Sequence, residues 1–210
     1  MTSAQLPTAD LETLLAAPLG LRERKKLKTR RAIRAAAFGL FAAQGYEATT
    51  VDQIAADADV SPSTFFRYFP TKEDLVVTDD YDPIMEAALR ARPAGEPLLD
   101  SLRQAIVVPL HSVLEHDLDN MLLRGRLLRD NPAVRARNLA DAKRSRDMLL
   151  QVFAEREGRP ADDFALQVQI TAVFAACSLT VEHWAERNGV DNLIDLVEQA
   201  FDALASGFTR

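Results

Sequence analysis

Positively charged side chains are concentrated near the start of this sequence. Between Arg22 and Arg31, seven lysines and arginines stand against a single acid, Glu23. The whole chain carries a formal charge of −6, whereas residues 22–72 sum to +5 and residues 73–210 to −9. A local excess of Lys and Arg attracts polyanions such as nucleic acid. Taken alone, the stretch also fits the solvated start of a helix, so the neighbouring residues must show whether it contacts nucleic acid.

Two short helices are predicted after this basic stretch. Thr50 followed by Gln53 has the form of a capping box, which opens a helix with one apolar face. Ser61 is the predicted N-cap of the second helix, because Pro62 suits its first position and Pro70 forces it to end. Two short helices joined by a tight turn form a helix-turn-helix, whose second helix can enter the major groove of DNA.

The second of these helices carries the side chains suited to DNA chemistry. An exposed Arg67 would read a base, because its guanidinium matches the acceptor pair of guanine. Thr50, Tyr68 and Lys72 are predicted phosphate contacts, since they stand at helix ends where backbone N–H groups also face anions. The full set of predicted DNA contacts is Arg30, Thr50, Ser61, Ser63, Thr64, Phe66, Arg67, Tyr68 and Lys72.

The run TTVDQIAADADVSPSTFFRYFPTKEDL, residues 49–75, resembles the helix-turn-helix signature of the TetR family of bacterial one-component repressors. The sequence departs from the signature at Ser63, where glycine is common, and at Phe66, where the hydroxyl of a common tyrosine usually reaches a phosphate. The resemblance implies a homodimer that binds a double-stranded DNA operator and a small-molecule effector. The matching residues are Thr50, Ile54, Ala55, Val60, Ser61, Thr64, Phe69, Lys72, Glu73 and Leu75.

The elements that position these residues are predicted to be helices throughout. An amphipathic helix is expected from about Arg22 to Gly45, and Phe65 and Phe69 are expected to fill the small core beside it. Thr71 is expected to cap the next helix. Further helices are predicted at 72–92, 96–115 with a bend at Pro109, 118–129, 131–157, 162–188 and 191–208.

The chain is therefore expected to be all-α with two domains. We divide it into a flexible extension at residues 1–20, a three-helix DNA-binding domain with the helix-turn-helix at 21–72, and a larger C-terminal helical domain for ligand binding and dimerisation at 73–210. The resemblance implies that the last two helices pair with their copies in the dimer. The predicted dimer contacts are Leu193, Leu196, Val197, Ala200, Phe201 and Leu204.

A ligand site in the second domain is also implied by the resemblance. A pocket built from apolar side chains would suit an apolar or amphipathic molecule, although such residues equally form an ordinary core. The C-terminal half is similar to regulators with acyl-CoA-like ligands, including the mycofactocin-type branch, and its arginines would then meet phosphates or else form a solvated face. The predicted ligand contacts are Met121, Arg124, Met148, Phe174 and Cys177.

Several other functions are excluded by what the sequence lacks. His111 and His116 stand five apart, so they do not form a metal pair on one helix face, and no nucleophile-elbow, Walker or dinucleotide-binding motif is present. We expect no catalytic residue, metal or cofactor. The lone Cys177 and the lack of a signal peptide predict a cytoplasmic protein, and the apolar run 170–181 is too short to span a membrane. The alternative function is a helical dimeric adaptor without sequence-specific DNA binding.

Overall fold

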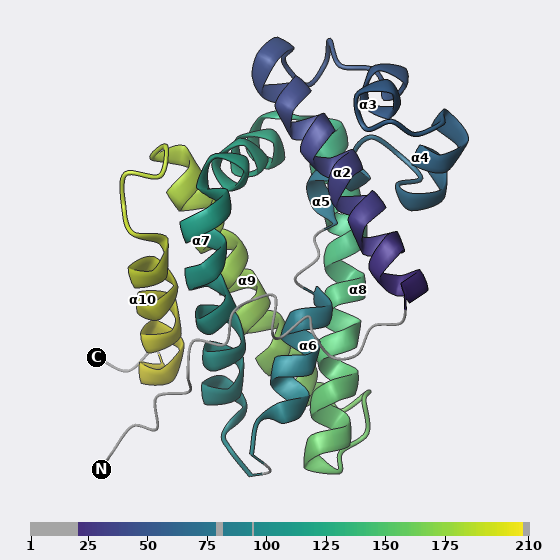
Figure 1. Cartoon of the computed structure of the whole chain (residues 1–210). Coiled ribbons are helices and arrows are strands. Elements are labelled where there is room, and N and C mark those ends of the chain that lie inside the picture. Colours follow the sequence, from purple (N-terminus) through teal and green to yellow (C-terminus); the bar gives the residue numbers. More distant parts are fainter. Residues whose placement is uncertain (1–20, 79–81, 94, 208–210) are drawn as a thin grey trace.

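A computed structural model describes residues 21–78, 82–93 and 95–207. Within these residues the chain forms helices and no strand, as expected for an all-α fold. In Figure 1, helices α2, α3 and α4 make one lobe, and α6 to α10 make a larger bundle beside it. The predicted flexible extension at residues 1–20 lies outside the described residues.

The helix-turn-helix forms where local capping predicts it. Helix α2 (Leu21–Gln44) ends at a glycine with φ of +87°, and α3 (Val51–Asp57) begins with the expected capping box. In that box the Thr50 hydroxyl accepts the Gln53 N–H at 3.2 Å, and the Gln53 side chain accepts the Thr50 N–H at 2.9 Å. These reciprocal bonds set the start of α3.

Helix α4 (Pro62–Tyr68) is the second helix of the motif. Its N-cap hydroxyl, from Ser61, accepts the Thr64 N–H at 3.1 Å, and Pro62 occupies the first turn as predicted. Phe65 and Phe69 are fully buried, which confirms that they fill the core of this lobe. Because α4 is anchored by these two rings, its remaining faces are held in a fixed orientation.

The predicted continuous helix over 72–92 is wrong. Helix α5 is a single turn (Asp74–Val77) that ends at Thr78, and α6 (Asp82–Ala91) starts afresh after it. Pro83 explains the interruption, since proline lacks an N–H and fits a helix only in its first turn. The chain therefore leaves the first lobe through a single helical turn rather than through one long helix.

Four longer helices build the second domain close to the predicted ranges: α7 (Leu98–Asp130), α8 (Pro132–Glu157), α9 (Phe164–Glu186) and α10 (Leu193–Ser206). Helix α7 is kinked at Asp117 (φ −142°, ψ 25°), where the sequence predicts a break between two helices. The non-helical angles thus fall at Asp117 rather than at Pro109.

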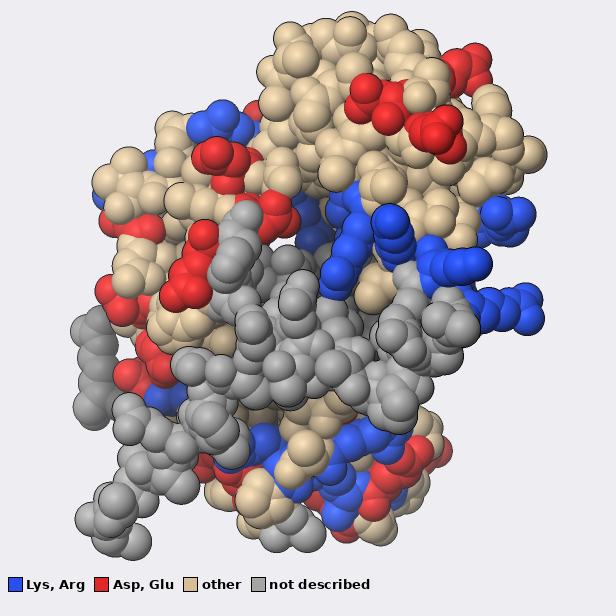
Figure 2. Space-filling model, in the orientation of Figure 1, with Lys and Arg blue, Asp and Glu red and all other residues tan. Residues whose placement is uncertain are grey.

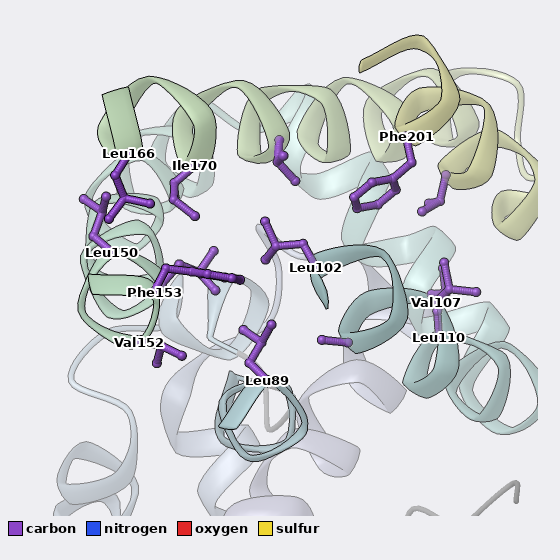
Figure 3. Packing of buried hydrophobic residues seen from close by; sticks show 14 of the residues in the cluster. Leu89, Leu102, Val107, Leu110, Leu150, Val152, Phe153, Leu166, Ile170 and Phe201 are labelled. Carbon is purple, nitrogen blue, oxygen red and sulfur yellow. The ribbon is translucent and has the colours of Figure 1, made fainter. Parts of the chain in front are cut away.

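Two hydrophobic cores hold the molecule together. The larger one lies among α6 to α10 and includes Leu89, Phe153 and Phe201, which are at most 1% exposed (Figure 3). The smaller one lies under α2 to α5 and also takes in Val134 of α8, with α7 side chains packed against it. Each fully buried side chain of this size stabilises the fold by about 1.5–3 kcal/mol. Because the smaller core draws on α7 and α8, the two lobes are packed together.

Candidate DNA-binding site

The exposed face of α4 combines an aromatic and a cationic side chain. Phe66 is 50% exposed, and Arg67 beside it is exposed as well. Ser63 lies one turn earlier on the same face, whereas Phe65 points into the core. The Arg67 guanidinium lies 5.5 Å from the centre of the Tyr68 ring. Three of the predicted DNA contacts therefore share one accessible surface, with Tyr68 at its edge.

The hydroxyl groups at the start of α4 bond to one another. The Ser61 hydroxyl lies 2.9 Å from that of Ser63 and donates to the Thr64 hydroxyl at 3.0 Å. Thr50 uses its hydroxyl in the capping box of α3. These side chains are predicted DNA contacts, and the structure gives them a capping role within the motif.

A second group of exposed basic residues lies at the start of α2. The first turns of the helix expose Arg22, Lys25, Lys26, Lys28 and Arg31. Figure 2 shows Lys and Arg side chains gathered over this N-terminal part of α2. Exposed charges of one sign on consecutive turns form the kind of patch that contacts DNA phosphates without reading sequence.

Lys72 is turned toward the protein. Its ammonium donates to the backbone carbonyls of Tyr46 at 2.8 Å and Thr49 at 3.1 Å, and it lies 4.0 Å from the centre of the Tyr46 ring. The Tyr46 hydroxyl donates to Glu73 at 3.1 Å. Burial, together with the Glu73 carboxylate, raises the pKa of Tyr46 well above its ordinary value. Lys72 thus ties the turn before α3 to the segment after α4, a role that its position at a helix end did not reveal.

Arg30 is also directed inward from α2. Its guanidinium donates to the Tyr68 carbonyl at 3.2 Å and to the Thr78 hydroxyl at 2.8 Å, and it lies 4.5 Å from the centre of the Phe69 ring. Arg34, one turn later, donates to the Thr78 carbonyl at 2.5 Å. Arg30 therefore joins α2 to the end of α4 and to the segment after it.

Arginines from the second domain also form hydrogen bonds with α5. Arg137 of α8 donates to the Asp74 carboxylate at 2.6 Å, and Asp74 is almost fully buried. Arg124 of α7 donates to the carbonyl of Val77 at 2.8 Å. Arg124 is a predicted ligand contact, and in the structure this hydrogen bond places it at the contact between the two lobes. We refer to Asp74–Thr78, which accepts hydrogen bonds from arginines of α2, α7 and α8, as the α5 anchor.

Comparison with known proteins agrees with this architecture. Residues 33–77 match the family model of bacterial regulatory proteins of the tetR family, and residues 96–209 match the MftR C-terminal domain, which is a TetR C-terminal family. The chain belongs to the TetR family. The resemblance of residues 49–75 is thereby confirmed, and this TetR protein is a DNA-binding transcriptional regulator with a helical C-terminal domain.

Relatives of this TetR protein cover nearly its whole length. It is 35% identical to the HTH-type transcriptional regulator TcmR of Streptomyces glaucescens, over 97% of this chain and 92% of that one. It is 25% identical to the putative mycofactocin biosynthesis transcriptional regulator MftR of Mycobacterium tuberculosis, over 89% and 94% of the two chains. Both matches extend through both lobes.

Solved structures share the fold. The TetR-family repressor FadR of Thermus thermophilus, in complex with lauroyl-CoA, is 26% identical with a TM-score of 0.56, over 86% of this chain and 95% of that one. FadR of Bacillus subtilis, in complex with stearoyl-CoA, is 21% identical with a TM-score of 0.58, over 85% and 99%. The second likeness concerns the fold alone.

The predicted ligand residues of this TetR protein lie beside its larger core. Met121, Met148, Phe174 and Cys177 are partly buried and pack against that core. Burial raises the pKa of the Cys177 thiol to about 11, so the thiol stays protonated at neutral pH. These side chains are shared between α7, α8 and α9, as a site among helices requires.

A separate groove of about 460 Å³ runs between α8 and α9. Its lining is mostly polar, with Arg146 and Asp147 on one wall and Gln167 and Thr171 on the other, and it contains none of the predicted ligand residues. A polar, open groove of this kind does not match the apolar site expected from the sequence.

The predicted dimer contacts on α10 require a correction. Leu193, Val197 and Phe201 are at most 3% exposed and belong to the protomer's own core, so they cannot meet a partner. An amphipathic stripe shows which face of a helix is buried, and here the face is covered by α7 and α9 of the same chain. Leu196, Ala200 and Leu204 are partly buried and remain predicted contacts.

Helix α9 exposes apolar side chains along most of its length. Phe164 is 78% exposed, Val168 51% and Leu179 65%, with exposed Ala172 and Ala175 between them. These five residues recur at helical spacing, and we refer to them as the α9 face. By length and composition alone, α9 is apolar enough to cross a membrane, although its uninterrupted apolar run is short. In this fold a partner protein would also account for the exposure.

Proposed function

We propose that this protein is a homodimeric repressor that binds a near-palindromic operator in double-stranded DNA and is released by a small apolar or amphipathic ligand. The observation that carries the proposal is the exposed face of α4, where Phe66 and Arg67 stand beside the basic start of α2. Two such units in a dimer would enter successive major grooves, so the operator would consist of two similar half-sites. A protein acting on the chromosome in this way works in the cytoplasm.

The proposed DNA contacts divide by chemistry. Arg67 would donate two hydrogen bonds to a guanine edge, whereas Lys25 and its neighbours on α2 would contact phosphates. Thr50, Ser63 and Tyr68 border the same surface and would contact the sugar-phosphate backbone around α4, as would Ser61 and Thr64. Arg30 and Lys72 would act indirectly, because their side chains hold the elements that present this surface.

The test compares Arg67→Ala with Lys25→Ala in a fluorescence anisotropy titration. The probe is a duplex selected from a randomised library with the purified protein, and a shuffled duplex is the control. Arg67→Ala should weaken binding to the selected duplex about 10- to 100-fold and barely change binding to the shuffled one. Lys25→Ala should weaken both alike and lower the salt slope by about 1.

Two results would count against this assignment. Equal losses on both duplexes for Arg67→Ala would remove Arg67 from base reading. Failure of the folded, dimeric wild-type protein to select any duplex would favour the adaptor function instead.

The proposed dimer joins two copies of the α9 face. A symmetric pair would bury Phe164, Val168 and Leu179 of each copy against the same residues of the other, and the two alanines between them would let the helices approach closely. Such pairing removes a large exposed apolar surface from water, which is the usual reason that a soluble protein displays one. The partly exposed residues of α10 would lie at its border.

The connection between dimer and DNA would run through the part of α7 after its kink. There a Cβ added to Gly125 would lie 2.6 Å from the Cβ of Ala185 in α9, so the two helices are in close contact. On its other side the same segment packs Leu127 against the smaller core, and Arg124 holds the α5 anchor. A ligand that tilts this segment would change the spacing of the two α4 helices.

The proposed ligand is amphipathic, with an apolar part among Met121, Met148, Phe174 and Cys177. The likeness to Thermus thermophilus FadR in complex with lauroyl-CoA supports an acyl-CoA-like class. We place the ligand in the domain formed by residues 73–210 and DNA recognition in residues 21–72, with the α5 anchor shared between them. The ligand would lower operator affinity by the ratio of its affinities for the two conformations.

A further inference from the structure

Phe66 is an unusual side chain for a DNA-facing surface. It is 50% exposed at the middle of α4, on the face that carries Ser63 and Arg67. Its ring meets the buried Phe65 ring edge-on, with centroids 5.4 Å apart and planes at 86°. Phe65 is itself fully buried, so this contact helps to orient the exposed ring. The protein thus holds an apolar group in a defined orientation in the middle of its recognition surface.

The chemistry of phenylalanine limits what this ring can recognise. It has no donor or acceptor, so it offers no hydrogen bond to a phosphate or to a polar base edge. In the major groove, the apolar group that distinguishes one base pair from the others is the 5-methyl group of thymine. The nearby hydroxyls of Ser61 and Ser63 bond to each other, which leaves Phe66 and Arg67 as the large side chains directed outward.

We infer that Phe66 is a specificity-determining residue that packs against the methyl group of a thymine in each operator half-site. This inference rests on the proposed DNA-binding function and adds a particular base to it. Because Phe66 and Arg67 are neighbours on one short helix, the thymine lies within a few base pairs of the guanine that Arg67 contacts. A ring that merely packed on sugars would show no preference among bases.

The experiment removes the methyl group alone. In the selected duplex, each thymine is replaced in turn by deoxyuridine, which pairs identically but lacks the 5-methyl group, and binding is measured by anisotropy. At one thymine in each half-site, the wild-type protein should lose about fourfold in affinity, as expected for one buried methyl group. Both half-sites changed together should lose about 16-fold.

Protein variants assign the loss to Phe66. In Phe66→Ala the deoxyuridine effect at that position should fall below twofold, while other thymines behave as in the wild type. Phe66→Tyr keeps the ring and should keep the effect, and Arg67→Ala, on the same face, should keep it too. Because Phe66 is half exposed, its replacement leaves the core intact. Unchanged deoxyuridine effects at the other thymines show that each variant is folded.

The outcomes separate this inference from the function on which it rests. If the selected duplex binds specifically but no thymine shows an effect that depends on Phe66, the assignment is overturned and DNA recognition stands. If Phe66→Ala weakens every duplex by the same factor, the ring contacts the backbone, and the assignment is again overturned. If no duplex can be selected, both the inference and the proposed function fail.

Discussion

Truncating Leu179 on the α9 face should dissociate the proposed dimer. Burying a leucine side chain completely stabilises an association by about 1.5–3 kcal/mol. Leu179 is 65% exposed in the protomer, so about 1–2 kcal/mol is available to each copy. A two-fold interface contains the residue twice, which gives about 2–4 kcal/mol for the dimer. Leu179→Ala should therefore raise the dimer dissociation constant about 30-fold or more.

The assay is sedimentation velocity across a dilution series, which gives the dissociation constant from the change in mass with concentration. The matched control is Leu139→Ala on α8. Leu139 is 74% exposed, and the substitution deletes the same atoms from a side chain of similar accessibility on another helix. This control should leave the dissociation constant within twofold of the wild type.

Two outcomes would contradict a dimer interface on α9. If Leu179→Ala and Leu139→Ala both associate like the wild-type protein, the α9 face is not the interface, and its exposure needs another explanation. If Leu139→Ala dissociates the dimer and Leu179→Ala does not, the copies pair through α8.

Three further predictions concern stability, measured by urea unfolding at a fixed protein concentration. Phe201→Ala should cost about 3–5 kcal/mol and leave the mass of the dimer unchanged, because its ring lies in the protomer's own core; a monomeric variant would contradict this. Arg137→Met should cost about 1.5–3 kcal/mol, because the buried Asp74 loses its cation but keeps its bonds from Thr71, and Asp74→Asn in the same chain should recover part of the loss. The hydrogen bond from Arg92 lowers the pKa of Glu96 from 4.5 to about 2. The ion pair therefore contributes its full stabilisation above pH 4.5 and loses it as the pH falls toward 2. Glu96→Gln should make the free energy of unfolding depend less on pH in this range, and an unchanged dependence would exclude the pair as its cause.

The helix starts were predictable because the bonds that set them are local. The capping box of Thr50 and Gln53 and the cap at Ser61 involve groups only three residues apart, so the sequence places them side by side in any fold that contains the helix. The break between α5 and α6 also has a local cause, because Pro83 lacks an N–H and fits a helix only in its first turn. A single helix over 72–92 is incompatible with that proline.

The positions of charged side chains were not predictable in the same way. Lys72 finds carbonyl groups 26 and 23 residues earlier in the chain, and Arg137 finds Asp74 at a separation of 63. A cation at a helix end satisfies a backbone carbonyl as readily as a phosphate, so its sequence position alone does not choose between them. The role of Lys72 is decided by the packing of the turn before α3 against the segment after α4.

The stripe on α10 illustrates a related limit. Its spacing correctly identified which residues are buried, including Phe201, but not which surface covers them. The more informative signal was on α9, where apolar residues occur on several sides of one helix. Helices α7, α8 and α10 of the same protomer all pack on α9, yet Phe164, Val168 and Leu179 stay exposed. The apolar residues left exposed on α9, rather than the stripe on α10, therefore support the proposed dimer contact.

The strength of the α5 anchor restricts where a ligand-driven movement can occur. Typical coupling energies between two sites are about 1–3 kcal/mol, and one hydrogen bond to a charged group contributes about 1.5–3 kcal/mol. The α5 anchor is held by three such bonds, from Arg137, Arg124 and Arg34, so the proposed ligand would not break all of them. The anchor, α2 to α4 and the parts of α7 and α8 packed on them would then move together, and the change would be taken up elsewhere. The non-helical residue Asp117 is suited to this, because it separates the part of α7 in the larger core from the part that packs on the smaller one.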